Sequence, residues 1–365
     1  MPNRRDGDLR EKLSPYLWNR IRELKALYGE HSREVKGLTL QYLKDGREHI
    51  VEDEERQRHY EADVLLSYEG KRLKFVERLY KRSLAIEITL ICAANCRWCL
   101  RRNYPLISPK EEELLSIAKY CGSDEVKKDL FEILITGGDP LMVPDRLNFL
   151  IDAIVEFAPN IKIVRIGSKL PVQDPQRIDD HVLWVLRKRE HIKIELGTHI
   201  NHPIEFSEEA IDAYRKIEEN DITIYNQSVL LKGVNDNLET LINLYDQLRY
   251  LRIESHYLFH CVPIRGMKHH RTSIKKGLEL IRALTSCGKI SGRCKPMFTA
   301  MTDIGKITLY EGVIRDRDQG NRVLLKSHYS FEERKKWNSS WKFPDSAQID
   351  EDGLMSVWYL DGSDD

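Results

Sequence analysis

Short apolar runs alternate with longer amphipathic stretches along the chain from residue 84 onward. The apolar runs are rich in β-branched residues, which is typical of strands buried in a parallel sheet. The predicted strands are 84–91, 132–136, 161–167, 192–197, 222–229 and 253–261. The predicted helices that follow them are 111–120, 145–156, 177–187, 207–219, 237–248 and 273–284. This order predicts repeated βα units around one sheet.

The unbroken series of βα units favours a partial, open (β/α)6 TIM-like barrel of the α/β class. A dinucleotide-binding sheet is the alternative, but no Gly-x-Gly-x-x-Gly follows the first predicted strand. We expect a mainly helical N-terminal extension over 1–78, the barrel over 79–290 and a C-terminal extension over 291–365. The acidic, glycine-containing tail 361–365 is expected to fray.

Three cysteines lie close together directly after the first predicted strand, in the run Cys92-Ala-Ala-Asn-Cys96-Arg-Trp-Cys99. Three thiolates at these gaps can hold one iron-sulfur cluster while leaving one iron without a protein ligand. Buried structural thiols and a zinc site are the alternatives, but zinc sites usually pair two Cys-x-x-Cys-like hooks and no second hook follows. The spacing matches the radical S-adenosylmethionine (SAM) signature.

Composition narrows the class of protein. The chain has 365 residues, 41% apolar and 32% charged, with 58 basic and 58 acidic side chains. Neither disorder nor attraction to nucleic acid is expected from this balance. The first residues lack a signal-peptide core, and Glu87 interrupts the apolar run before the cysteines. We therefore expect a cytoplasmic protein without a membrane segment, whose seven cysteines do not form a disulfide framework.

The second predicted strand leads into Thr136-Gly137-Gly138-Asp139-Pro140-Leu141. Glycines permit close backbone approach, and amides and carbonyls at a strand end can clasp an amino acid's carboxylate and ammonium. Taken alone the motif is equally a plain turn. After a three-cysteine loop it is the expected clasp for the methionine end of SAM.

Longer segments carry a family resemblance from about residue 78 to 326. They are Ile163-Val164-Arg165-Ile166-Gly167-Ser168, Pro175-Gln176-Arg177-Ile178, Thr198-His199-Ile200-Asn201-His202-Pro203 and Asn226-Gln227-Ser228-Val229-Leu230-Leu231-Lys232-Gly233-Val234-Asn235-Asp236. On these motifs the chain resembles the lysine 2,3-aminomutase family of radical SAM, pyridoxal-phosphate enzymes. The resemblance implies an isomerase that moves the amino group of an α-amino acid from C2 to C3.

The resemblance also implies which residues bind SAM and the cluster. Cys92, Cys96 and Cys99 would hold a [4Fe-4S] cluster, and Trp98 would lie beside the adenine, although a core tryptophan is the simpler reading. The implied SAM-binding residues are Trp98, Gly137, Gly138, Asp139, His199 and Gln227. From the residues alone, His199 and Gln227 fall at strand ends where they could reach a shared ligand. A structural histidine is equally open.

The residues implied for binding pyridoxal phosphate come from the start of the predicted barrel segment and from the segment that follows it. The resemblance implies that Lys306, within Gly305-Lys306, carries the cofactor and that Arg78 and Arg82 bind its phosphate. Tyr80 lies between these two arginines in the sequence. Arg101 falls at the family's substrate-carboxylate position, where a guanidinium fork would suit. Lys306 and Arg101 are the expected catalytic residues. A solvated lysine and a surface ion pair are the alternatives.

The sequence departs from the family where a lysine substrate's distal ammonium would be read. The expected Cys-Asp step is Cys261-Val262, and Met301 or Thr302 stands near the second carboxylate. An unpaired buried ammonium would cost several kcal/mol, which argues against lysine as the substrate. Basic residues over 265–271 leave an acidic or polar amino acid as an option.

Two other functions remain open. A radical SAM enzyme without pyridoxal phosphate could act on a peptide, a protein lysine or a small molecule, and a non-catalytic iron-sulfur protein could sense redox state. The expected partners are an amino-acid substrate and a one-electron donor such as flavodoxin or ferredoxin. Association into a homo-oligomer is left open.

Overall fold

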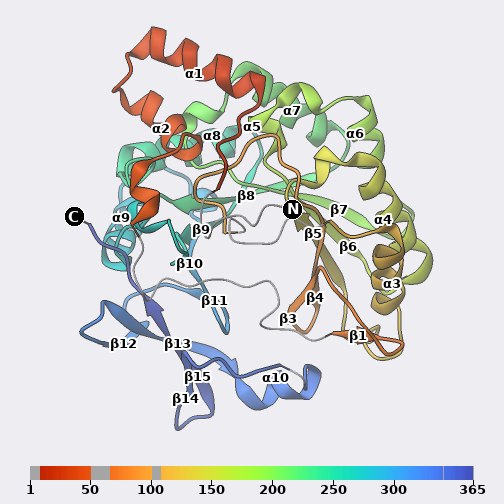
Figure 1. Ribbon diagram of the computed structural model, residues 1–365. Helices are drawn as coiled ribbons and strands as arrows, with labels where there is room; N and C mark the ends of the chain where they lie inside the picture. The colour runs from red at the N-terminus through yellow and green to blue at the C-terminus, as the bar shows by residue number, and fades with distance from the viewer. Residues whose placement is uncertain (1–8, 51–65, 101–107, 340, 365) are drawn as a thin grey trace.

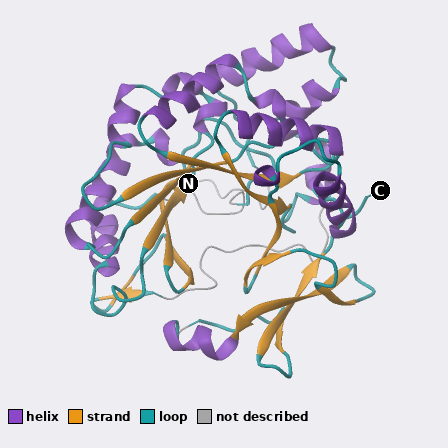
Figure 2. Cartoon of the chain, turned by 180° about the vertical axis from the view of Figure 1, so that it is seen from behind, coloured by secondary structure: helices purple, strands orange, loops and turns teal. Residues whose placement is uncertain are grey.

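A nine-stranded sheet curled into a half-barrel forms the centre of the protein (Figures 1 and 2). The computed structural model describes residues 9–50, 66–100, 108–339 and 341–364. Seven parallel strands make up the body of the sheet: β4 (Ser83–Thr89), β5 (Glu132–Gly137), β6 (Ile163–Gly167), β7 (Lys193–Thr198), β8 (Thr223–Leu230), β9 (Glu254–His260) and β10 (Met297–Thr302). Antiparallel strands border it, β3 (Val76–Tyr80) at one edge and β11 (Gly305–Thr308) at the other. The expected α/β partial barrel is confirmed.

Helices cover the convex face of the sheet (Figure 2). They are α3 (Glu111–Cys121), α4 (Pro144–Phe157), α6 (Asp180–Val185), α7 (Glu208–Glu219), α8 (Leu238–Tyr250) and α9 (Ile274–Ser286). In β5, Ile133 and Ile135 are fully buried among the side chains of these helices, while Glu132 and Thr136 alternate with them and are only partly buried. The period of two thus gives an apolar convex face and a concave face on which polar groups gather.

The predicted strands match β4 to β9 within a few residues, because β-branched runs fit a sheet buried on its helical face. The helix predicted over 177–187 is wrong in its extent. A 3-10 turn over Pro175–Arg177 comes first, and α6 begins only after Asp179, whose carboxylate accepts from the amide of Val182 at 2.9 Å. The N-cap therefore starts a new helix instead of continuing the turn.

The sheet extends beyond the interval 79–290 that we expected for the barrel. β10 pairs in parallel with β9 and turns back into β11, whose Lys306 lies opposite Met301. Gly305 in this hairpin has φ +121°, which favours glycine, and an added Cβ would lie 3.1 Å from the Tyr329 ring. Lys306 consequently belongs to an edge strand of the half-barrel itself.

The N-terminal extension folds over the end of the barrel that carries the cysteine loop (Figure 1). It contains α1 (Pro15–Tyr28), α2 (Arg33–Tyr42) and the 3-10 turn η1 (Gly46–His49). The cysteine loop is tied to it through backbone hydrogen bonds, from Asn95 to the carbonyl of Lys12 and from Arg97 to the carbonyl of Gln41, both at 2.8 Å. A small hairpin of β1 (Ser67–Tyr68) and β2 (Lys71–Arg72) precedes β3.

The C-terminal part forms a separate four-stranded antiparallel sheet. Its strands are β12 (Ile314–Arg317), β13 (Arg322–Ser330), β14 (Ala347–Ile349) and β15 (Leu354–Leu360), with α10 (Phe331–Trp337) after β13. The tail that we expected to fray is held through residue 364. Asp361 accepts from the amide of Ile274 at 2.7 Å and Asp364 from that of Ser273 at 2.8 Å, so both carboxylates bind the N-terminus of α9. None of the helices within the described ranges has the length and apolar character needed to cross a bilayer.

Candidate functional site

The three cysteines lie on the loop that follows β4. Cys92, Cys96 and Cys99 are half-buried, and none of them forms a disulfide with another described residue. Burial raises the pKa of Cys96 to about 12, and the ammonium of Lys169 opposes that rise. Within the described ranges no three His, Cys, Asp or Glu side chains converge as a finished metal site. The three thiols lie on one loop close enough to raise one another's pKa, and as a donor set they suit an iron-sulfur cluster.

An ion pair inside the protein anchors the cysteine loop. The Arg97 guanidinium donates to both carboxylate oxygens of Glu48, with Nε 2.7 Å from Oε1, and also to the carbonyl of Leu9 at 2.8 Å. Arg97 and Glu48 are both buried. Because Glu48 lies in η1, this pair fixes the loop to the N-terminal extension.

The glycine motif packs against the strand that leads to the cysteines. The amide of Gly138 donates to the carbonyl of Thr89 at 2.5 Å, and that of Asp139 to the carbonyl of Ile91 at 2.7 Å. A Cβ on Gly137 or Gly138 would lie within 2.4 Å of these same carbonyls. The glycines are required for close approach of two backbones, and the Gly138 and Asp139 amides already have partners.

Asp139 connects the ends of β5 and β6. Its carboxylate accepts from the Ser168 hydroxyl at 2.7 Å and from the backbone amides of Lys169 at 2.9 Å and Leu141 at 3.1 Å. Burial nevertheless raises the pKa of Asp139 to about 6. The side chain is fully engaged in positioning the loop after β6.

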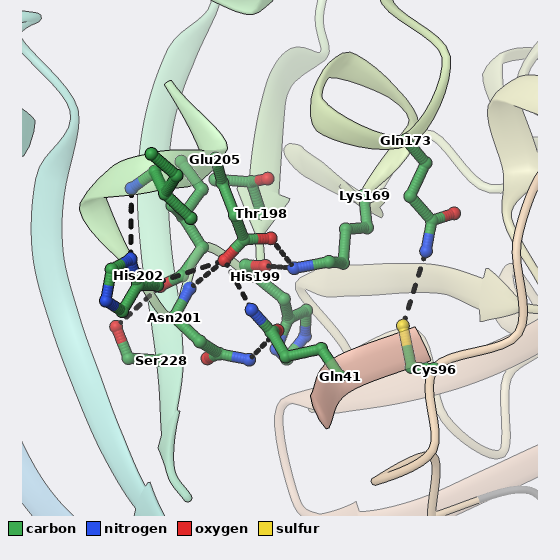
Figure 3. Close-up of polar contacts among 12 residues, drawn as sticks. Gln41, Cys96, Lys169, Gln173, Thr198, His199, Asn201, His202, Glu205 and Ser228 are labelled. Carbon is green, nitrogen blue, oxygen red and sulfur yellow. Dashed lines mark hydrogen bonds and ion pairs between the residues drawn. The ribbon is translucent and has the colours of Figure 1, made fainter. Parts of the chain in front are cut away.

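That loop places an ammonium at the centre of the site (Figure 3). The Nζ of Lys169 donates to Glu205 and to the carbonyl of His199, and it lies 5.6 Å from the Trp98 ring and 5.8 Å from the Tyr42 ring. The side chains of Lys169 and Glu205 are 7% and 1% exposed. Sequence reasoning missed this pair, although Lys169 directly follows one of the family motifs.

The Gln41 side chain of α2 joins the same network. Its amide nitrogen donates to the carbonyl of Gly37 at 2.7 Å and to Glu205 at 3.2 Å, and its oxygen accepts from Asn201 at 2.9 Å and from the Trp98 indole at 3.3 Å. The buried carboxamide uses all its donors and acceptors, which also fixes its orientation. Nothing in the sequence indicated Gln41, because it lies in an extension outside the barrel motifs.

The residues predicted to contact SAM meet beside this network. The rings of Trp98 and His199 are 5.8 Å apart. Burial, then Lys169, lowers the pKa of His199 to about 4, and its buried Nδ1 has no hydrogen-bond partner among the described residues. Gln227, half-buried on β8, lies close to Gly197, where an added Cβ would be 3.0 Å from its Nε2. An unpartnered ring nitrogen in a polar setting fits a site that a ligand completes.

Lys306 lies in an aromatic and charged interior. Its Nζ is 4.6 Å from the Tyr257 ring centroid and 5.4 Å from that of Phe259. Its backbone amide donates to the Tyr80 hydroxyl at 3.0 Å, and its carbonyl accepts from the Tyr329 hydroxyl at 2.8 Å. Burial, followed by the nearby Arg165 charge, lowers the pKa of Lys306 to about 8. A substantial neutral fraction at pH 8 makes this amine nucleophilic.

The structure does not gather all the residues predicted for pyridoxal phosphate. Tyr80 is beside Lys306, whereas the Arg78 guanidinium donates to the carbonyl of Lys81 at 2.8 Å and lies over Trp337 of α10. The Arg82 guanidinium lies 4.5 Å above the Phe131 ring. Arg101, predicted to bind the substrate carboxylate, is outside the described residues.

The lysine and the cysteine loop nevertheless face one interior. The Phe259 ring, 5.4 Å from the Nζ of Lys306, packs in one apolar cluster with Trp98 of the cysteine loop. The amine of Lys306 and the cysteine loop thus lie on the same side of the sheet.

Comparison with known proteins supplies relatives. No family model matches the chain. A protein of Aquifex aeolicus (strain VF5), provisionally named L-lysine 2,3-aminomutase, is 35% identical over 76% of this chain and 74% of its own. The L-lysine 2,3-aminomutase of Clostridium subterminale is 35% identical over 60% of this chain and 52% of its own. The glutamate 2,3-aminomutase of Clostridioides difficile (strain 630) is 31% identical over 61% of this chain and 52% of its own. The chain spans about half the length of these last two. A solved radical SAM methyltransferase from Sphaerobacter thermophilus aligns with TM-score 0.46 at 16% identity, covering 63% of this chain and 69% of its own.

Proposed function

Because the chain belongs to the lysine 2,3-aminomutase family of radical SAM enzymes, we propose that it is a radical SAM, pyridoxal-phosphate-dependent 2,3-aminomutase. Its reaction would move the amino group of an α-amino acid from C2 to C3. The observation that carries the proposal is Lys306, a lysine on the barrel's edge strand whose pKa is lowered to about 8 inside the aromatic interior.

The cluster and SAM would occupy the end of the barrel that carries the cysteine loop. Cys92, Cys96 and Cys99 would hold a [4Fe-4S] cluster, and the thiol donor set supports this assignment. Trp98, His199 and Gln227 would contact SAM, with the unpartnered Nδ1 of His199 as support. Gly137, Gly138 and Asp139 would shape the loop that contacts the methionine end of SAM. Their packing leaves backbone carbonyls as the acceptors available to SAM at this place. When bound, the cluster supplies one electron that cleaves SAM and yields the 5′-deoxyadenosyl radical.

The protein's own residues would position the substrate and exclude water. Lys306 would carry pyridoxal phosphate, and Tyr80 and Tyr329 hold the strand on which it lies through hydrogen bonds to its backbone. Arg101 would bind the substrate carboxylate. For the cofactor phosphate, Arg78 and Arg82 stay predictions that require their guanidinium groups to leave Trp337 and Phe131. The aromatic walls around Lys306 limit the access of water to the reacting carbon.

The substrate is proposed to be an amino acid without a cationic side chain. Val262 lies in an apolar cluster with Trp98 and Phe259, against which Met301 packs. A lysine ammonium at this place would lose its hydration without a carboxylate from Val262 or Met301 to pair with. One of the family relatives is named a glutamate 2,3-aminomutase, which is consistent with a family that accepts more than one side chain.

The setting of the enzyme follows from this chemistry. An oxygen-sensitive cluster and seven cysteines without a disulfide among the described residues suit the reducing cytoplasm. A one-electron donor such as flavodoxin or ferredoxin would reduce the cluster. Whether the chain assembles into a homo-oligomer is tested by the sedimentation measurement below.

The test uses protein purified without oxygen and reconstituted with iron, sulfide and pyridoxal phosphate. The protein is incubated with SAM, dithionite and a panel of α-amino acids, and 5′-deoxyadenosine and β-amino acids are measured by mass spectrometry. We expect a β-amino acid from a substrate other than lysine, formed only when pyridoxal phosphate is present.

The other outcomes decide between the alternatives. Turnover of SAM without any need for pyridoxal phosphate would favour the radical enzyme that acts without this cofactor. The absence of 5′-deoxyadenosine under strong reduction would favour the non-catalytic iron-sulfur protein. Sedimentation of the same preparation gives its oligomeric state.

A further inference from the structure

A buried glutamine side chain contacts one of the candidate cluster cysteines. Gln173 is the last residue of α5 (Leu170–Gln173), the single helical turn that follows β6. Its Nε2 lies 3.3 Å from the Sγ of Cys96 (Figure 3). The residue is only 2% exposed, so water does not compete strongly for this contact.

The backbone of Gln173 is fixed from two directions. Its amide donates to the carbonyl of Lys169 at 3.1 Å, and Lys169 is itself held by Asp139 and Glu205. Its carbonyl accepts from the hydroxyl of Ser14, the N-cap of α1. The side-chain amide therefore starts from a well-anchored position, and its approach to Cys96 is part of the fold.

The chemistry of the two groups sets the direction of the hydrogen bond. A cysteine sulfur bound to iron has no proton and can only accept, whereas a carboxamide NH2 can only donate. Hydrogen bonds to cluster sulfurs tune the reduction potential of an iron-sulfur cluster. Reduction adds one negative charge to the cluster, so a donor directed at its sulfur stabilises the reduced form more than the oxidised form.

We propose that Gln173 donates an N–H···S hydrogen bond to cluster-bound Cys96 and thereby raises the reduction potential of the cluster. Gln173 is on this view a positioning residue that acts through Cys96 and touches neither SAM nor substrate. The inference rests on the proposed function, since it requires that Cys96 binds the cluster.

The consequence concerns the electron that starts the reaction. A cluster of higher potential accepts an electron more readily from a given donor, and the reduced form is the one that cleaves SAM. The N-terminal extension takes part in this tuning because Ser14 holds the carbonyl of Gln173.

The test is a redox titration of the reconstituted cluster followed by electron paramagnetic resonance. Gln173→Leu removes the donor, and Gln173→Glu replaces it with a carboxyl group, titrated at a pH above its own pKa so that it only accepts and adds negative charge. We expect the midpoint potential to become more negative in the order wild type, Gln173→Leu, Gln173→Glu. Gln176→Leu is the matched control, because Gln176 is exposed three residues further along the chain, and its midpoint should equal that of the wild type.

A measurement on the wild-type protein keeps the proposal testable if a variant fails to assemble its cluster. With 15N-labelled glutamine side chains, pulsed electron paramagnetic resonance of the reduced protein should show coupling to one amide nitrogen. A Gln173→Leu protein with full cluster content and an unchanged midpoint, or a wild-type spectrum without this coupling, would overturn the inference. Failure of the wild-type protein to assemble any cluster would instead overturn the proposed function on which it rests.

Discussion

The cysteine end of the half-barrel and the interior around Lys306 differ in whether a buried ammonium is paired with a carboxylate. At the cysteine end, the ammonium of Lys169 pairs with Glu205, and Gln41 uses its whole carboxamide on neighbouring groups. Around Lys306 the side-chain nitrogen instead faces the rings of Tyr257 and Phe259, and no carboxylate among the described residues lies within ion-pair distance of it.

This difference distinguishes a paired structural lysine from the lysine that we propose as the reactive group. Lys169 is neutralised by a carboxylate and holds loops together, whereas Lys306 has a pKa lowered to about 8 by burial and by Arg165. Two buried lysines in one barrel thus differ in their charge environment: the ion pair with Glu205 suits a structural role for Lys169, and the lowered pKa suits the covalent role that we propose for Lys306. Each prediction below changes one side of this comparison.

Removing a proposed cluster ligand should have the largest effect on the cysteine end. Cys96→Ala leaves two thiolates on the loop, too few for a stable cluster, so iron-sulfur absorbance and SAM cleavage should both be lost. Cys287→Ala is the control, because Cys287 is a half-buried free thiol outside the loop. A Cys96→Ala protein that binds iron and cleaves SAM like Cys287→Ala would contradict the assignment.

Removing the lysine that we propose to carry pyridoxal phosphate should affect the cofactor and leave the cysteine loop intact. Lys306→Ala should lose the absorbance of protein-bound pyridoxal phosphate while reductive SAM cleavage stays measurable, because the cysteine loop is untouched. Lys326→Ala is a matched control, since Lys326 on β13 also lies over an aromatic ring, 5.5 Å from Tyr310. Retention of the cofactor band in Lys306→Ala would refute the assignment.

Breaking the buried ion pair should destabilise the protein without changing any proposed ligand. Glu205→Ala leaves the Lys169 ammonium buried without its carboxylate, which should cost roughly 3–5 kcal/mol in the free energy of unfolding. Urea denaturation gives the value. Glu218→Ala, which breaks the exposed pair with Arg252, should cost at most about 1 kcal/mol. Equal losses for the two variants would show that the Lys169–Glu205 pair is not the scaffold that we describe.

The pH dependence of cofactor attachment reports the lowered pKa of Lys306. Only the neutral amine attacks the aldehyde, so attachment should rise with pH through about 8 and level off above it. Below pH 8 the rate should fall about tenfold per pH unit. The rate of the absorbance change after mixing with pyridoxal phosphate provides the profile. A profile that continues to rise to pH 10.5, the ordinary lysine value, would contradict the lowered pKa.

Loosening the strand that carries Lys306 should have the smallest effect. Tyr329→Phe removes the hydrogen bond to the carbonyl of Lys306, which is worth about 1 kcal/mol. We expect a several-fold weaker affinity for pyridoxal phosphate, measured by absorbance titration, with SAM cleavage unchanged. Tyr310→Phe is the control, because Tyr310 contacts a different lysine, Lys326. An equal loss of affinity in this variant would contradict the claim that Tyr329 positions Lys306.

The sequence predicted most of the half-barrel because its signals are local. Runs of β-branched residues marked β4 to β9, and a contiguous motif marked the three cysteines. The edge strands were not assigned to the barrel, since a short hairpin such as β10–β11 joins the sheet through pairing with β9 and not through its own pattern.

The scaffold around the cysteines could not be predicted from one sequence. Gln41 and Glu205 are 164 residues apart along the chain and meet only after folding. Gln173 is likewise 77 residues from Cys96. Lys306 was identified through the family resemblance alone, while the rings of Tyr257 and Phe259 that face it come from a different strand.

The most direct test of the account locates the covalent cofactor. Wild-type protein is reconstituted with pyridoxal phosphate at pH 8, reduced with borohydride, digested and mapped by mass spectrometry. The account predicts one labelled peptide with the modification on Lys306. A label on another lysine, or none above the level of the unreduced protein, would contradict the claim that Lys306 is the reactive group of this barrel.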